Sequence, residues 1–205
     1  NGSDKIEDSP FMKTLADMHH LSQTLRKRRF RNGSVDFFVP EPEIQFNEIG
    51  TVNQIGIVDH NAAHQLIEEF MLAANQAVAL SLHDKNIPCI HRIHEAPDQT
   101  KLLEFKEFIS SFGLKLISPE KIRSQDLNNL LKKTQGTPEE RLVNTLLLRT
   151  MKKARYSESD PGHYCLGFEH YAHFPSPIRR YPDLVVHRII KKYLKNKCSK
   201  KEKTT

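Results

Sequence analysis

The sequence predicts an α+β fold in which helices dominate and the sheet is small. Long stretches with apolar residues at helical spacing alternate with short runs rich in Val, Ile and Phe that have the pattern of strands. A lone sheet this small would leave apolar faces uncovered, so the pattern favours part of a larger fold. The chain has 205 residues and shows no internal repeat or long linker, which corresponds to one domain or a portion of one.

The N-terminal half is predicted to hold two long helices with strands between them. Gly33 ends the first helix, Glu48-Ile49-Gly50 forms a turn between two strands, and Asn61 caps the second helix. A buried stripe on that second helix is expected at Leu66, Phe70, Ala74 and Val78. The predicted elements are Pro10–Arg29 (helix), Val35–Val39, Glu43–Phe46 and Val52–Val58 (strands) and Ala62–Leu82 (helix).

The C-terminal half is predicted to be mostly helical. Pro88 stops the chain before a short strand, and Gly113 ends the helix that follows. The short run Lys115–Ile117 could pair with another strand. The predicted elements are Cys89–Ile93 (strand), Asp98–Phe112, a helix within Ser118–Lys133, Pro138–Tyr156 (a long helix), Tyr164–Glu169 (strand) and Pro182–Leu194 (helix).

The positive charge is modest and uneven. Lys plus Arg is 31 and Asp plus Glu is 25, which gives a net charge of +6. Arg26–Arg31 is one basic run, and Lys191–Lys203 carries seven lysines against one Glu. Such runs attract phosphates and favour nucleic-acid binding, although each is also compatible with a solvated surface or a tail. Residues 1–9 and 196–205 are expected to be disordered because they are polar.

The cysteines indicate a reducing compartment. Cys89, Cys165 and Cys198 are far apart and odd in number, so no disulfide framework is expected. No apolar run reaches the length of a membrane span, and no signal peptide is visible. We therefore expect a cytoplasmic protein that does not bind membranes.

The segment Tyr171–Arg188 has the most distinctive pattern. Two prolines precede Arg179 and Arg180, and Tyr181-Pro182-Asp183 then opens a helix. The arginines should lie just before a helix N-terminus, where the dipole and free N–H groups add to their charge. The pattern predicts a binding place for an anion, most plausibly a phosphate. The alternative is that the arginines pair with nearby carboxylates.

Four blocks in the same order resemble the ribonuclease II/R family, the RNB exoribonucleases, with the bacterial RNase R branch as the nearest form. The last block contains HFPSPIRRYPDL, within a region that begins at Leu147. The four blocks are Leu25–Phe38 with the following Pro40-Glu41-Pro42, Asn61–Ala79, Ile90–Phe105 and Leu147–Arg188.

The resemblance implies a partial RNB catalytic domain fold, with residues 1–205 forming the C-terminal part of that one domain. It also implies a processive 3′→5′ exoribonuclease that hydrolyses single-stranded RNA to nucleoside 5′-monophosphates with Mg²⁺. Cold-shock-type and S1-type domains would flank the domain in the whole protein. The family carries a compact aspartate motif for its metal, and this chain shows no D-x-D or DD group. Catalysis by this chain alone is therefore open, and the alternative is a non-catalytic RNA-binding or scaffold protein.

The candidate site residues follow from the resemblance and from local pattern. Arg179 matches the family's SPIR arginine, which implies a catalytic contact to the phosphate near the scissile bond. A glutamate in the Glu68-Glu69 pair is implied to contact ribose hydroxyls, and helical spacing puts Glu68 and Asn75 on one polar face. The expected RNA-binding residues are Arg180 (or a partner of Asp183), Tyr181 (stacking or packing), His173 (fixing the loop), Glu68, Glu69, Asn75 and Phe37 (stacking or core).

No metal site is predicted within this chain. Histidine is abundant, with 11 residues, but none stands in the CxxC or HExxH context that makes a zinc assignment specific. Magnesium is expected only in the complete family domain, with ligands outside this chain.

Overall fold

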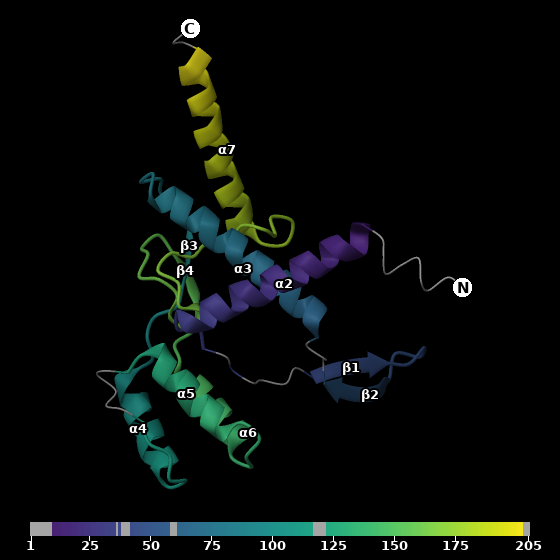
Figure 1. Cartoon of the computed structure of the whole chain (residues 1–205), viewed down its shortest axis with the longest axis vertical. Helices are drawn as coiled ribbons and strands as arrows, with labels where there is room; N and C mark the ends of the chain where they lie inside the picture. The colour runs from purple at the N-terminus through teal and green to yellow at the C-terminus, as the bar shows by residue number, and fades with distance from the viewer. Residues whose placement is uncertain (1–9, 36, 38–41, 58–60, 117–121, 203–205) are drawn as a thin grey trace.

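The structure is a computed structural model, and it describes residues 10–35, 37, 42–57, 61–116 and 122–202, with side chains as far as residue 195 (Figure 1). Helices dominate the described part, together with two antiparallel sheets of two strands each, so the predicted fold class is confirmed. The elements in chain order are α2 (Pro10–Arg31), β1 (Pro42–Phe46), β2 (Val52–Ile57), α3 (Ala62–His83), β3 (His91–Ile93), α4 (Gln99–Ser110), α5 (Ser124–Thr134), α6 (Glu140–Thr150), β4 (Arg155–Ser157), the 3₁₀ turn η2 (Tyr164–Leu166) and α7 (Tyr181–Glu202).

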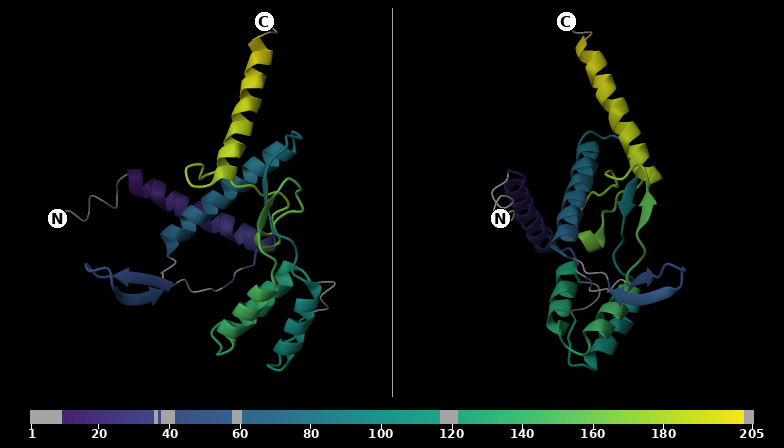
Figure 2. Two further views of the ribbon diagram at one scale, coloured as in Figure 1. Left: turned by 180° about the vertical axis from the view of Figure 1, so that it is seen from behind. Right: turned by 90° about the vertical axis from the view of Figure 1, so that its right-hand side faces the viewer.

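Three groups of elements surround the small β3–β4 ribbon. Helices α2 and α3 cross side by side, α4, α5 and α6 form a separate helical lobe, and α7 projects away from the rest (Figures 1 and 2). The β1–β2 hairpin is drawn away from the helical lobe in Figure 1 and in the left view of Figure 2. None of the described helices combines the length and the apolar character that crossing a bilayer requires.

Among the described residues, two of the three buried apolar clusters hold most of this arrangement together. One lies within the helical lobe, where residues such as Leu102, Phe105 and Leu147 of α4 and α6 are fully buried. The other joins the C-terminal half of α3 to α7 through Ala79, Leu82, Cys89, Ala172 and Val186. Because Ala172 and Val186 lie on either side of the segment that precedes α7, the second core fixes both ends of that segment.

The hairpin was predicted correctly. Strands β1 and β2 pair antiparallel, with Glu43 opposite Gly56. In the turn, the Asn47 side chain accepts from the N–H groups of Ile49 and Thr51, and Gly50 takes a positive φ of 80°. A glycine has no Cβ to oppose that conformation, so Gly50 allows the reversal.

Two predictions in the C-terminal half are wrong. Helix α6 ends at Thr150, and the chain then turns to pair Arg155–Ser157 with β3, so the long helix to Tyr156 is not formed. The residues at 151–155 favour helix by propensity, and tertiary pairing overrides that preference. The expected strand Tyr164–Glu169 is instead the 3₁₀ turn η2, which ends at Gly167 with a φ of 64°. A left-handed residue at this point interrupts a strand.

The cap of α3 is confirmed, and its predicted buried stripe is correct only at Leu66. Asn61 accepts hydrogen bonds from the N–H groups of Ala63 and His64, at 3.0 and 3.3 Å. The expected positions Phe70, Ala74 and Val78 are only half-buried. The fully buried positions are Leu66, Glu69, Leu72, Asn75, Ala79 and Leu82. Two polar residues lie inside because partners on other elements satisfy them, which apolar periodicity alone does not reveal.

Some expectations fall partly outside the described residues. Val35 and Phe37 are not in a strand, and the rest of the predicted strand to Val39 includes residues that are not described. The same holds for Lys115–Ile117 and for the expected disorder at residues 1–9 and 203–205. Helix α7 continues to Glu202, past the predicted end at Leu194, so residues 196–202 have a helical backbone where disorder was expected.

Candidate functional site

The loop before α7 is fixed at its start by a buried amide on α3. Asn75 is 1% exposed. Its side-chain N–H donates to the hydroxyl of Tyr171 at 3.0 Å, and its carbonyl oxygen accepts from the backbone N–H of Phe174 at 2.7 Å. Burial raises the pKa of the Tyr171 hydroxyl, which keeps it a neutral hydrogen-bonding group. The structure places Asn75 under the loop as an anchor, and its predicted contact to RNA stays a prediction.

A buried carboxylate fixes the other end of the same loop. Asp183 is 0% exposed, and one of its oxygens accepts from the backbone N–H of Ser176 at 2.9 Å. The same oxygen accepts from the guanidinium of Arg180 at 2.8 Å. Arg180 therefore adopts the pairing that the sequence analysis left as its alternative. His187, one turn further along α7, lies 3.0 Å from the carbonyl of Phe174 and stacks on its ring.

These anchors leave Arg179 at the surface. The backbone N–H groups of Arg179 and Arg180 both point to the carbonyl of Ser176, which closes a tight turn before the first residue of α7. Within the described part of the chain, the Arg179 guanidinium has no hydrogen bond or ion pair. Ile178 is 102% exposed and Tyr181 is 68% exposed beside it. The turn thus presents a cation, an apolar side chain and an aromatic ring to solvent.

His173 connects this loop to the β3–β4 ribbon. Its Nδ1 lies 2.8 Å from the hydroxyl of Tyr156, and Arg92 lies over the Tyr156 ring at 4.9 Å. Burial, together with the nearby Arg180, lowers the pKa of His173 to about 4. A neutral His173 at pH 7 can accept the Tyr156 hydrogen bond, which fits the expected role in fixing the loop. Whether it contacts RNA stays a prediction.

The two glutamates of α3 have different surroundings. Glu69 is 2% exposed and makes a double hydrogen bond to the guanidinium of Arg29, which also donates to the hydroxyl of Ser34. It therefore joins α3 to α2 in this structure, and its contact to a ribose stays a prediction. Glu68 is more open, with 39% of its side chain exposed, and lies 3.8 Å from the same Arg29. Glu68 remains the glutamate that could reach a ligand.

Phe37 lies in a cationic groove that the sequence analysis did not identify. The groove has a volume of about 940 Å³, and Phe37 lines it while also packing against the core of the helical lobe. Its lining, among the described residues, includes no Asp or Glu. The basic lining residues are Arg92, Lys101, Arg149, Lys152 and Lys153. Lys152-Lys153 was the available sequence signal, but the predicted helix Pro138–Tyr156 placed both lysines within a helix, whereas α6 ends before them at Thr150.

The groove adjoins the loop through Arg92. This residue lines the groove and donates its backbone N–H to the carbonyl of Tyr171, at the start of the loop. Glu95 lies nearby and accepts from Lys152 at 2.9 Å and Arg155 at 3.0 Å, and these bonds lower the pKa of its carboxyl group. Besides burial, Arg180, Arg92 and Arg179 all lower the pKa of His173, so cations of the groove and of the turn lie around this one residue.

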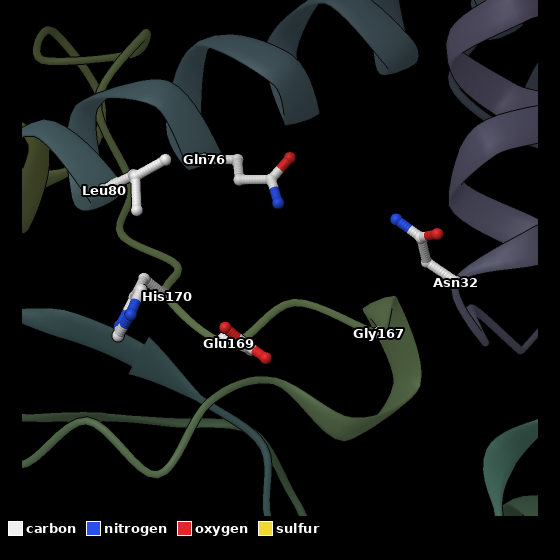
Figure 3. Close-up of a pocket in the computed structure, with 6 residues that line it drawn as sticks. All are labelled: Asn32, Gln76, Leu80, Gly167, Glu169 and His170. Atoms are coloured by element: carbon white, nitrogen blue, oxygen red, sulfur yellow. The ribbon is translucent and has the colours of Figure 1, made fainter.

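A second, smaller cavity lies between α3 and the 167–170 segment (Figure 3). It has a volume of about 390 Å³. Figure 3 shows Gln76 and Leu80 on α3 facing Glu169 and His170 across it, with Asn32 on the far side.

A magnesium centre of the kind that the resemblance implies needs clustered oxygen ligands. In the described ranges, one group of at least three histidine, cysteine or carboxylate side chains has converging ligand atoms, namely His83, Asp160 and His170. Two of its three members are imidazoles. The residues present do not fit a magnesium centre, and we assign no chemical step to that ion.

Comparison with known proteins identifies the class. The family model described as the RNB domain matches residues 1–196, so the chain belongs to the RNB family of exoribonucleases. Ribonuclease R of Aquifex aeolicus is 40% identical over 193 residues, and ribonuclease R 1 of Lactococcus lactis is 42% identical over 188 residues. These alignments cover 94% and 91% of this chain but 27% and 22% of the relatives. The chain therefore spans about a quarter of the length of the curated relatives it matches.

Solved structures agree with this assignment. Apo RNase R of Mycoplasma genitalium matches with a TM-score of 0.83 and 31% identity over 87% of this chain and 28% of its own. The same enzyme has been solved with ribose-methylated single-stranded RNA and with double-stranded RNA. A yeast pseudonuclease also matches, with a TM-score of 0.65 at 23% identity, which shows the fold alone.

Proposed function

We propose that this chain forms the RNA-contacting part of a 3′→5′ exoribonuclease domain that degrades single-stranded RNA processively to nucleoside 5′-monophosphates. The observation that carries the proposal is the exposed Arg179, presented on a turn that Asp183 and Asn75 hold rigid beside a cationic groove. Related enzymes of the same family are solved with RNA bound, which supports the same ligand class here.

The chemistry of these groups suits a phosphodiester. A guanidinium offers a planar set of N–H donors that matches two phosphate oxygens, and its charge opposes the negative charge that develops during hydrolysis. Because Arg180 is paired with Asp183, Arg179 is the arginine of this turn that can contact the phosphate. A prealigned turn loses little conformational freedom when the ligand binds, so it contributes more to affinity than a flexible turn would.

The groove and Glu68 would hold the rest of the strand. Its basic residues neutralise successive phosphates, and Phe37 offers a face on which a base can stack. Glu68 is placed to accept from a ribose hydroxyl, which would favour RNA over DNA. Tyr181 is exposed enough to stack on a neighbouring base. The remainder of the domain and its flanking domains would be partners in the whole protein.

The non-catalytic alternative rests on one observation. The described residues bring no group of carboxylates together, and RNA hydrolysis in most nucleases uses metal ions held by such groups. A chain with the Arg179 turn and the groove but without that cluster would bind RNA without cleaving it.

One assay separates the two functions. The purified chain is incubated with 5′-labelled single-stranded RNA and Mg²⁺, in parallel with Arg179→Ala. A ladder that shortens from the 3′ end, and disappears in the variant, supports catalysis by this chain. RNA that is bound in a gel shift but left intact supports the binding function, and absence of both binding and cleavage contradicts the proposal.

A further inference from the structure

Four polar side chains from separate segments meet at the C-terminal end of α3. His83 is the last residue of α3, His91 lies in β3, and Asp160 and His170 lie in the loops before and after η2. Asp160 Oδ2 is 2.7 Å from Nδ1 of His170 and 3.3 Å from Nδ1 of His91. The rings of His83 and His170 stack with centroids 3.7 Å apart and planes at 24°.

The described residues leave polar atoms of this cluster without hydrogen-bond partners. Asp160 Oδ1 and His91 Nδ1 are buried and have no hydrogen-bond partner among them. The ion-pair partners of Asp160 in that same set are both histidines, which carry no permanent charge as Lys or Arg does. A carboxylate oxygen that is buried without a partner is costly. The hydrogen bond with His170 accounts for one oxygen of Asp160. It does not account for the other oxygen or for the approach of His83.

A bound cation would account for the converging ligand atoms and for the unpartnered polar atoms of Asp160 and His91. We propose that His83, Asp160 and His170 bind a zinc ion, with His91, next to the same carboxylate, as the fourth candidate ligand. Imidazole nitrogens with one carboxylate are a typical donor set for Zn²⁺, whereas Mg²⁺ prefers oxygen ligands throughout.

Binding requires a rotation of the His83 ring, because two stacked, nearly parallel imidazoles cannot both direct an in-plane nitrogen lone pair at one ion. The three ligand atoms lie within 4.8 Å of one another. Ligand atoms around a tetrahedral zinc lie about 3.4 Å apart, given bonds of about 2.0–2.1 Å. His83 is exposed at the end of its helix, so its ring can turn out of the stack toward the ion, and it provides a path for the ion to enter.

The ion would act on the loop that carries Arg179. It would tie the end of α3 to the residue directly before Tyr171, which is the first anchored residue of that loop. The site is therefore structural, separate from the RNA-contacting groups and independent of whether the chain is catalytic.

Zinc binding to the untagged, metal-free chain tests the proposal. Zn²⁺ is titrated by competition with a chromophoric chelator, and the melting temperature is measured with and without Zn²⁺. The variants are His170→Ala and the isosteric Asp160→Asn, with His20→Ala as a matched control because His20 is exposed on α2 away from the cluster. Far-ultraviolet circular dichroism checks that each variant folds.

We expect one zinc ion per chain, not displaced by excess Mg²⁺. Zn²⁺ at 100 times its Kd should raise Tm by about 5–10 °C. Both cluster variants should lose about tenfold or more in affinity, while His20→Ala binds like the parent. If the parent chain binds no zinc, or if both folded variants bind it as tightly as His20→Ala does, the proposal is wrong.

Discussion

Arg180 and Asp183 form an ion pair of 2.8 Å across the first turn of α7, with the carboxylate fully buried. This pair divides the roles of two adjacent arginines, since it holds Arg180 in the loop and leaves Arg179 to face solvent. The oxygen that binds Arg180 also accepts from the N–H of Ser176, so one buried carboxylate sets the shape of the whole turn.

Replacing Asp183 by Asn should destabilise the protein. The variant keeps the shape but removes the charge opposite Arg180, whose side chain is 18% exposed. Losing one member of a largely buried pair should lower the free energy of unfolding by about 3 kcal/mol, measured by urea denaturation. The control is Glu95→Gln, which breaks exposed ion pairs with Lys152 and Arg155 and should cost less than about 1 kcal/mol. Equal losses in the two variants would contradict the role given to Asp183.

Gly167→Ala should destabilise more than Gly136→Ala. Both glycines have positive φ, at 64° and 75°. A Cβ at Gly167 would lie 2.9 Å from the carbonyl oxygen of Asn32, whereas nothing lies within 4 Å of one at Gly136. The second variant thus measures the conformational cost, about 1 kcal/mol, and the first adds a steric clash of about 1–3 kcal/mol. If thermal melting ranks the two variants equally, the close approach of η2 to the end of α2 is not as described.

The short-range features of this fold could be predicted from the sequence, and the features that depend on distant partners could not. Asn61 was identified as a cap because its hydrogen bonds lie within three residues. The burial of Glu69 and Asn75 was not predicted, because it depends on Arg29, Tyr171 and Phe174, far away in the chain. Likewise, the end of α6 at Thr150 depends on strand pairing with β3.

The candidate site shows the same limit. Arg179 and Arg180 lie in one contiguous motif. That motif predicted phosphate binding and, as the alternative, pairing with a nearby carboxylate. The groove around Phe37 and the cluster at Asp160 each combine residues from several segments, so no local spacing indicates them.

Stability should fall as the pH drops below neutrality. Burial lowers the pKa of His163 from 6.5 to about 3 in the folded protein. The unfolded chain therefore binds the proton first as pH falls. The stability that neutral His163 contributes is complete above pH 6.5 and is lost toward pH 3. The slope should reach about 1.4 kcal/mol per pH unit for this one group. His173, with its pKa near 4, acts in the same direction.

Urea denaturation at several pH values in EDTA measures this dependence. His163→Asn is the informative variant, since its side-chain oxygen can take over the bond that His163 Nδ1 accepts from the N–H of Leu166. It should fold and show a smaller slope between pH 6.5 and 4 than the parent does. An unchanged slope would mean that His163 is not the buried neutral group described here.

The central claim is that Arg179 contacts an RNA phosphate, and the most direct test is the Kd for labelled single-stranded RNA measured by fluorescence anisotropy at several salt concentrations. The matched control is Arg188→Ala, which removes one exposed positive charge further along α7. Arg179→Ala should weaken binding by about tenfold or more and reduce the salt slope by about one, while Arg188→Ala should have a markedly smaller effect. Equal weakening by both variants would mean that RNA affinity depends only on the total charge of the chain, and it would contradict the account.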